Sequence, residues 1–236
     1  MVQRAPLLEE VFQQRAAVAH VNSAADVATC EQFCREQRID LCVVRIPATR
    51  IDLATALQTS QYFLMETSLH FRRSVCGEVA SNADSDVSVR LAHADELRFA
   101  VSLVRNGFDA YTGHYHCDER LTQEHCTRLY ERYLEESWAA ENDFVLIAER
   151  AAAPVGVITL RKTNSEELEI LLATWSRQPL GVGRMICWNV IGWAASEGAR
   201  FVKTAVSVAN IAIQRVAIQN AFTPVLSEYV FHKWFS

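Results

Sequence analysis

The feature that most constrains the fold is a glycine-containing loop between a strand-like and a helix-like segment. Residues 168–173 are a short apolar run typical of a strand, and residues 185–195 are typical of a helix. Between them stands the sequence Gln178-Pro179-Leu180-Gly181-Val182-Gly183-Arg184. Glycine lets the backbone turn sharply and approach a ligand, and the unpaired amides of a first helical turn attract anions. The sequence therefore predicts a strand, an anion-binding loop and a helix N-terminus in succession.

The spacing of this loop argues against two common nucleotide folds. It reads Gln-x-x-Gly-x-Gly, which differs from the Gly-x-Gly-x-x-Gly of dinucleotide-binding folds, and no Lys-Ser/Thr follows as in ATPase phosphate loops. A plain strand-to-helix turn is the alternative at this stage.

The flanking segments extend the pattern. We expect strands at 87–91, 144–149, 155–160, 201–208 and at the C-terminal end up to His232, and helices at 94–105, 122–137, 183–197 and 211–219.

This order, with the Gln-x-x-Gly-x-Gly loop and Asn210 after a strand, resembles the GCN5-related N-acetyltransferases. The resemblance implies an α/β (α+β) fold with a twisted, mixed and mainly antiparallel sheet flanked by helices. It also implies an acyl-coenzyme A (acetyl-CoA or longer) as co-substrate and direct attack of an amine on the thioester. The implied acyl-CoA-binding residues are Leu172, Ala173, Gln178, Gly181, Val182, Gly183, Arg184 and Asn210.

The first 80 residues repeat part of this order. A strand at 40–46, a helix at 51–57 and a strand at 62–72 match residues 201–233 at a constant offset, with Tyr62 over Phe222 and Phe71 over Phe231. We interpret residues 1–80 as a truncated half-copy and 85–236 as a complete acyltransferase domain. Because the half-copy has no glycine loop of its own, we expect it to complete an acceptor pocket or to extend the sheet.

A half-domain followed by a full domain resembles the bacterial TDP-fucosamine acetyltransferase type. The resemblance implies, as acceptor, the amino group of a nucleotide-linked (dTDP) amino-deoxy sugar of the kind used in O-antigen synthesis. An acetyltransferase for another small amine (amino acid, polyamine or aminoglycoside) is one alternative. A CoA-binding domain without turnover is another.

Two glutamates are candidates for the acceptor side. Strict alternation along a strand puts Glu167 and Glu169 on the same face as Leu171 and Ala173. By resemblance Glu167 is a candidate general base, and Glu169 a candidate substrate contact. The alternative is that both carboxylates are solvated on the outer part of the strand.

A second polar cluster, residues 111–118, falls between the first two helices of the expected domain. Tyr111, His114 and His116 are candidate acceptor contacts, and His116 is the second candidate base, because histidine exchanges protons near neutral pH. A purely structural loop is the alternative. A metal site here is not expected, since the His-x-His-Cys spacing is not a usual zinc pattern.

The position seven residues after Asn210, where the family commonly has a tyrosine that protonates the thiolate, holds Ala217. The smaller side chain favours a longer acyl donor. Trp175, just after the fourth strand of the expected domain, either lines the site or contributes to a dimer face.

Composition limits the partners and the location. A net charge of −5 argues against nucleic acid or an anionic membrane as a partner. The seven cysteines are odd in number and unpatterned, so we expect free thiols in a reducing cytoplasm. A homodimer is left open.

Overall fold

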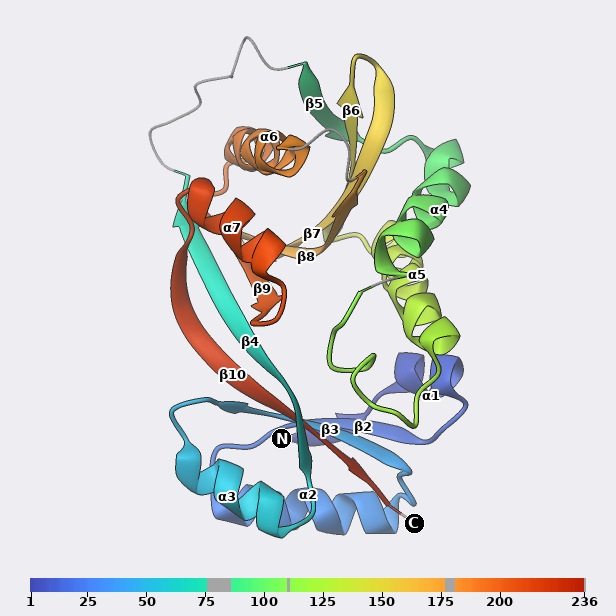
Figure 1. Ribbon diagram of the computed structural model, residues 1–236, viewed down its shortest axis with the longest axis vertical. Helices are drawn as coiled ribbons and strands as arrows, with labels where there is room; N and C mark the ends of the chain where they lie inside the picture. The colour runs from blue at the N-terminus through green and yellow to red at the C-terminus, as the bar shows by residue number, and fades with distance from the viewer. Residues whose placement is uncertain (76–85, 110, 177–180, 236) are drawn as a thin grey trace.

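The computed structural model describes residues 1–75, 86–109, 111–176 and 181–235, and it contains one ten-stranded sheet with helices on both faces (Figure 1). The strands are β1 (Val2–Arg4), β2 (Ala16–His20), β3 (Leu41–Pro47), β4 (Phe63–Ser74), β5 (Val87–Leu91), β6 (Asp143–Arg150), β7 (Ala153–Asn164), β8 (Glu167–Trp175), β9 (Phe201–Ser207) and β10 (Thr223–Trp234). The helices are α1 (Pro6–Phe12), α2 (Ala24–Glu36), α3 (Ile51–Thr59), α4 (Leu97–Phe108), α5 (Gln123–Ala139), α6 (Val182–Ser196) and α7 (Ile211–Gln219), with a 3-10 turn at Ala94–Glu96.

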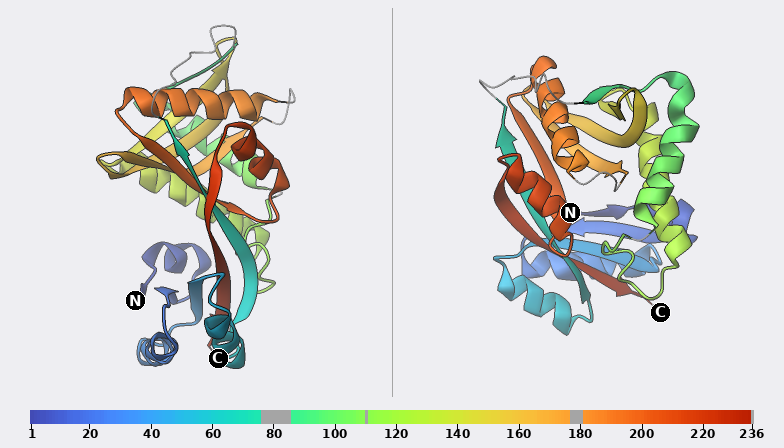
Figure 2. Two further views of the ribbon diagram at one scale, coloured as in Figure 1. Left: turned by 90° about the vertical axis from the view of Figure 1, so that its left-hand side faces the viewer. Right: turned by 45° about the horizontal axis from the view of Figure 1, so that its top comes forward.

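The strand order is β1-β2-β3-β10-β4-β9-β8-β7-β6-β5. The β2–β3 and β8–β9 pairs are parallel, and the other neighbours are antiparallel. Helices α6 and α7 pack on one face of the C-terminal strands, and α4 and α5 on the other (Figure 2). The expected mixed, mainly antiparallel α/β fold is therefore confirmed.

The final strand of each half pairs with the other half. Strand β4 lies between β10 and β9, while β10 pairs with β3, so these two long strands run side by side and join the two ends of the molecule (Figure 1). Helices α3 and α7, which begin at Ile51 and Ile211, are offset by 160 positions, and so are β3 and β9 and also β4 and β10. The registers follow the same offset, because Ser68 pairs with Ser207 as Glu228 pairs with Pro47. The two halves are thus related by a local two-fold axis through the Ser68–Glu228 pair. The division at residues 1–80 and 85–236 stays an interpretation.

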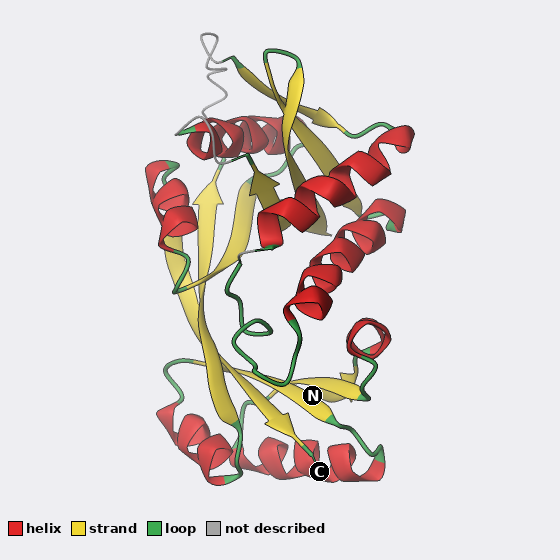
Figure 3. Cartoon of the chain, turned by 45° about the vertical axis from the view of Figure 1, so that its right-hand side comes forward, coloured by secondary structure: helices red, strands yellow, loops and turns green. Residues whose placement is uncertain are grey.

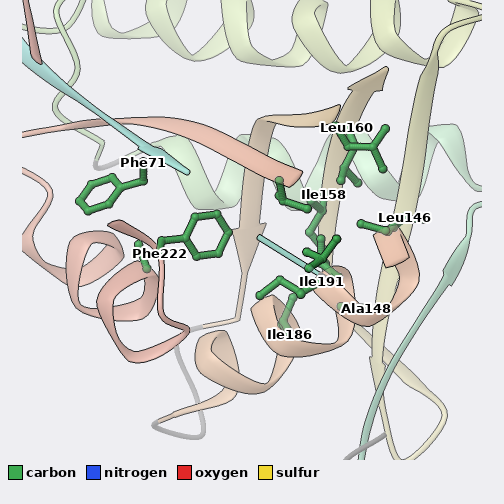
Figure 4. Close-up of a cluster of buried hydrophobic side chains, with 14 of the residues drawn as sticks. Phe71, Leu146, Ala148, Ile158, Leu160, Ile186, Ile191 and Phe222 are labelled. Atoms are coloured by element: carbon green, nitrogen blue, oxygen red, sulfur yellow. The ribbon is translucent and has the colours of Figure 1, made fainter. Parts of the chain in front are cut away.

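A large core cluster lies between α6, α7 and the C-terminal strands (Figure 4). Ile186 and Ile191 of α6 meet Ile158 of β7, and Phe222 and Phe71 close the cluster beside α7. Burial of such side chains contributes on the order of 1.5–3 kcal/mol each. This packing holds α6, and with it the glycine loop, against the sheet.

The predicted elements of the C-terminal half occur at the expected places, with differences in their bounds. Strand β7, for example, runs from Ala153 to Asn164, whereas 155–160 was expected. The expected helix at 94–105 begins as the 3-10 turn, and α4 continues to Phe108. Four N-terminal elements (β1, α1, β2 and α2) are not among those expected. Within the described residues, no helix is long and apolar enough to cross a membrane.

Candidate functional site

The site begins where two parallel strands separate. Strands β8 and β9 pair from Glu167–Phe201 to Ile170–Thr204, and beyond this point they diverge. At the fork the Thr204 hydroxyl donates a hydrogen bond to the Ile170 carbonyl at 3.3 Å. Leu171 has no partner on β7, because the β7–β8 register shifts there as in a β-bulge. The bulge bends β8 away from β9 and opens the sheet.

The glycine loop closes one side of this opening. Gly181 is the N-cap of α6 with φ of 90°, a conformation that side chains rarely allow. A Cβ at Gly183 would lie 2.5 Å from the Trp175 indole, so only glycine fits beneath this ring. The amides of Val182 and Gly183 precede the first hydrogen bond of α6 and carry the positive end of the helix dipole. The Arg184 amide is already engaged, since it donates to the Gly181 carbonyl at 3.1 Å. The helix start is suited to bind an anion.

An open cleft of about 810 Å³ lies between this helix start, α7 and the end of β8. It adjoins an apolar cavity of about 140 Å³ that passes between the diverging strands. Two exposed arginines, Arg184 and Arg215, line the open cleft and add positive charge. The site is therefore polar and cationic at its mouth and apolar inside.

The residues that the resemblance implied for cofactor binding are mostly brought together here. Gly181, Val182, Gly183 and Arg184 line the cleft, Leu172 lines the cavity, and Ala173 and Asn210 line both. The Asn210 side chain also caps α7, accepting a hydrogen bond from the Ile213 amide at 3.2 Å. Gln178 lies outside the described residues. Trp175 lines both spaces.

Aromatic side chains form the wall of the cavity on the α4–α5 side. Phe108 stacks on Tyr130 with centroids 4.1 Å apart, and Tyr111 meets both rings edge-on. His116 lies next to them, stacked on Tyr130 at 5.7 Å. Neither ring nitrogen of His116 has a hydrogen-bond partner among the described residues. Burial lowers the pKa of His116, so its imidazole is neutral near pH 7 and able to accept a proton.

His114 is placed differently from its neighbour. It is buried in a chain that runs from Asp118 through His232 and His114 to Arg45, with distances of 2.7, 2.9 and 3.2 Å. Because Asp118 accepts the Nδ1–H of His232, His232 Nε2 accepts from His114 Nδ1–H. His114 Nε2 then accepts from Arg45. Burial lowers the pKa of both histidines. Both ring nitrogens of His114 therefore have partners inside the protein. His114 was predicted to contact the acceptor, and in this geometry neither nitrogen is left for such a contact.

The loop that carries these residues runs from α4 back toward the N-terminal strands (Figure 3). Tyr115, in the middle of the loop, is buried against Leu41 and Val43 of β3 and Val230 of β10. The N-terminal half therefore holds the loop that borders the cavity.

The structure does not bring Glu167 to the cavity or to the open cleft. Glu167 lies three residues, roughly 10 Å along the strand, before the fork. Its carboxylate contacts Arg72 at 2.9 Å and Lys203 at 3.1 Å, and Lys203 also contacts Glu169 at 3.4 Å. Burial alone would raise the pKa of Glu167, but Lys203 and Arg72 together lower it.

The predicted shared face holds for Glu167 and Glu169, which both contact Lys203, but it is wrong for Ala173. The bulge at Leu171 shifts the alternation by one residue, so Ala173 packs with Ile170 in the core beneath α6, and Leu172 faces α4. Glu169 therefore shares its face with Leu172.

Glu66, a carboxylate that was not predicted from the sequence, lies close to the aromatic wall of the cavity at Tyr111. Glu66 of β4 interacts with the His114 backbone amide and the Ser207 hydroxyl, and its charge acts on Tyr111 of the cavity wall. Burial raises its pKa, while Arg45, the amide and the hydroxyl act in the opposite direction. A partly buried carboxylate with a raised pKa has the properties of a general base. Nothing in the local sequence around Glu66 signals this position, because it depends on β4 inserting beside β9.

Comparisons with known proteins agree with this fold. A family described as "Protein of unknown function (DUF2865)" matches residues 12–100. No curated protein matches the chain. A functionally unknown conserved protein from Staphylococcus epidermidis has a TM-score of 0.68 at 12% identity, covering 97% of this chain and 89% of that one.

Two other solved structures are similar over most of this chain. A GCN5-related N-acetyltransferase from Sphaerobacter thermophilus has a TM-score of 0.66 at 13% identity, covering 99% of this chain and 76% of that one. A tandem GNAT protein of the clavulanic acid biosynthesis pathway has a TM-score of 0.60 at 13% identity, covering 94% and 78%. At such identities the similarity establishes the fold, which is that of the GCN5-related N-acetyltransferases.

Proposed function

We propose that this protein is an acyl-CoA-dependent N-acyltransferase. The observation that carries the proposal is the fork between β8 and β9, which opens beside the N-terminus of α6. Such a fork exposes the backbone of a strand edge to an extended chain, and the helix start supplies amides for a diphosphate.

In this proposal the acyl-CoA lies along the end of β8. The backbone of Leu172 and Ala173 would pair with the pantetheine arm. Gly181, Val182 and Gly183 would donate amides to the diphosphate, and the guanidinium groups of Arg184 and Arg215 would add charge-assisted contacts.

The transfer step needs a base for the acceptor amine. As the amine nitrogen bonds to the thioester carbon, the carbon–sulfur bond breaks, the thiolate leaves and the amine loses a proton. We assign this proton to Glu66, directly or through water, because its position near Tyr111 and its raised pKa both suit the role. His116, whose imidazole is neutral and which also lies beside Tyr111, is the second candidate acceptor of the proton.

The finer proposal concerns the acceptor, for which we retain an amino-deoxy sugar linked to a nucleotide. The aromatic wall of Phe108, Tyr111 and Tyr130 supports it, because such rings stack on a base or on the apolar face of a sugar. A small cationic amine is the second candidate, and the Glu66 carboxylate beside the same wall favours it.

The test is thiol release from acetyl- and hydroxybutyryl-CoA, with mass detection of products. The acceptors are dTDP-3-amino and dTDP-4-amino 6-deoxyhexoses, spermidine, an aminoglycoside and an amino acid. Turnover confined to a dTDP-sugar supports the finer proposal, and turnover of the other amines alone overturns it. CoA binding without any turnover would contradict the enzymatic proposal and favour a binding domain.

A binding measurement tests the cleft separately. Replacing Arg184 and Arg215 together by alanine should weaken CoA binding roughly tenfold, by loss of charge-assisted contacts. Arg35→Ala, an exposed change on α2, is the control and should leave affinity unchanged. Equal CoA affinity in the double variant and the wild type would place the diphosphate elsewhere.

A further inference from the structure

Three cysteines that are scattered in the sequence meet in the core of the N-terminal half. Cys30 and Cys34 lie one turn apart on α2, and Cys42 faces them from β3. Their Sγ atoms lie within 4.8 Å of one another, and the three residues are at most 1% exposed. The spacing in sequence did not indicate such a cluster, because the α2–β3 packing creates it.

The distances resemble those of a tetrahedral thiolate site. With a metal–sulfur bond of about 2.3 Å, two sulfurs on a tetrahedral Zn²⁺ lie about 3.8 Å apart. Cys30 and Cys42 have their Sγ atoms 3.6 Å apart. The third sulfur, within 4.8 Å of both, needs a shift of about an ångström or less to complete the triangle.

A fourth donor stands beside the sulfurs. The Tyr62 hydroxyl lies 3.8 Å from Cys30 Sγ, close to the spacing of about 3.5 Å that oxygen and sulfur ligands have on one tetrahedral zinc. The Lys233 ammonium group, 5.1 Å from the Tyr62 ring centroid, is paired with the Glu31 carboxylate.

The local two-fold relationship indicates that packing alone does not require these groups. At the offset of 160 positions, Cys42 corresponds to Val202 and Tyr62 to Phe222, both buried in the C-terminal half. The same strand–helix–strand backbone is therefore filled there by hydrocarbon. In the N-terminal half all five residues of β2 pair with β3, so no fork like that between β8 and β9 opens there.

We infer that Cys30, Cys34 and Cys42, with the Tyr62 oxygen, form a structural site for a thiophilic divalent cation of the Zn²⁺ type. Binding replaces the three thiol protons by one metal ion, so it releases protons and ties α2 to β3. The site lies in the N-terminal half and does not depend on the proposed acyl transfer.

The experiment uses the full chain, purified without chelator from cells grown with added Zn²⁺. Metal content is measured by elemental analysis and native mass spectrometry. The protein is then incubated with Cd²⁺ or Co²⁺, whose thiolate charge-transfer absorption reports sulfur ligation. We expect one metal per chain and a thiolate band.

The matched variants are taken from the other half of the molecule. Cys42→Val and Tyr62→Phe install the residues found at the equivalent positions, which keeps both variants suited to the fold. Cys42→Val should lose the metal and the band, and Tyr62→Phe should keep the metal with an altered Co²⁺ spectrum. Cys126→Ala, a buried cysteine in another cluster, should keep both.

The inference is overturned if the folded wild type carries no metal as isolated and shows no thiolate band with Cd²⁺. It is also overturned if Cys42→Val binds as much metal as Cys126→Ala. In either case the three thiols serve only as small apolar core residues.

Discussion

Replacing Glu66 by glutamine removes the proposed proton acceptor and keeps the side-chain shape. Glu66 interacts with the His114 amide, the Ser207 hydroxyl and Arg45, and its charge reaches Tyr111 in the cavity wall. The glutamine oxygen can still accept from the His114 amide and its NH2 group can donate to the Ser207 hydroxyl oxygen, but the side chain loses the attraction to Arg45 and cannot accept a proton near neutral pH.

The expected loss follows from the size of general-base effects. Such a base typically accelerates a reaction by about 10²–10⁴-fold. We expect a fall in kcat of about 100-fold, at the lower end, because His116 beside the same wall retains some basic function. This loss corresponds to about 2.7 kcal/mol of transition-state stabilisation.

The pH dependence has a definite sign. Only the ionised carboxylate accepts a proton, and burial raises its pKa, so activity should rise with pH through that raised value. In Glu66→Gln this acidic limb should disappear. The same shift affects the free energy of unfolding. Because the pKa of Glu66 is higher in the folded protein than in the unfolded chain, the folded protein becomes less stable as the pH rises from the unfolded pKa to the folded pKa. The variant should therefore be at least as stable as wild type at pH 7.

The assay is initial-rate thiol release across pH with the best acceptor, beside urea denaturation of each variant. Glu167→Gln is the control, because Glu167 is held by Arg72 and Lys203 before the fork, and its kcat should stay within about threefold. A 100-fold loss in Glu167→Gln with full activity in Glu66→Gln would refute the assignment.

Three further predictions address the cleft, the cavity and the loop. Gly183→Ala should weaken CoA binding at least about tenfold in calorimetry, because its Cβ would lie 2.5 Å from the Trp175 indole. Gly192→Ala on the same helix, whose Cβ meets nothing within 4 Å, should bind normally. Ala217→Leu should fill part of the cavity of about 140 Å³ and lower kcat/KM for hydroxybutyryl-CoA more than for acetyl-CoA; equal losses would argue against an acyl pocket there. Asp118→Ala leaves the buried histidine and indole donors without their acceptor and should cost about 3 kcal/mol or more in urea unfolding; a loss below about 1 kcal/mol would contradict this account of the network.

Local patterns were enough for much of the C-terminal half. Residues 201–208 and 211–219 were expected as a strand and a helix, and β9 and α7 lie there. Hydrophobic periodicity and the positions of glycines are local signals, so they can be interpreted without knowledge of the rest of the fold. The repeat was also predicted from the sequence, because Tyr62 matches Phe222 and Phe71 matches Phe231 at the same offset. The strand registers follow that offset.

Other features could not be obtained from alternation along one strand. The bulge at Leu171 reverses which side chains face α6, and strict periodicity had placed Glu167 with Ala173. A bulge depends on how a strand is paired with its neighbour, and the sequence of one strand does not reveal it.

The sequence by itself determined the order of the C-terminal elements, the glycine loop and the repeat, because each is encoded within a short stretch of chain. Tertiary structure alone decided that β4 pairs with β10 and β9, and β10 with β3. It also decided that Glu66 lies near Tyr111, some 45 residues later in the chain, and that Cys30, Cys34 and Cys42 meet. These features arise from pairing and packing between distant segments. Their geometry depends on the free energy of the whole sheet, which no single segment encodes.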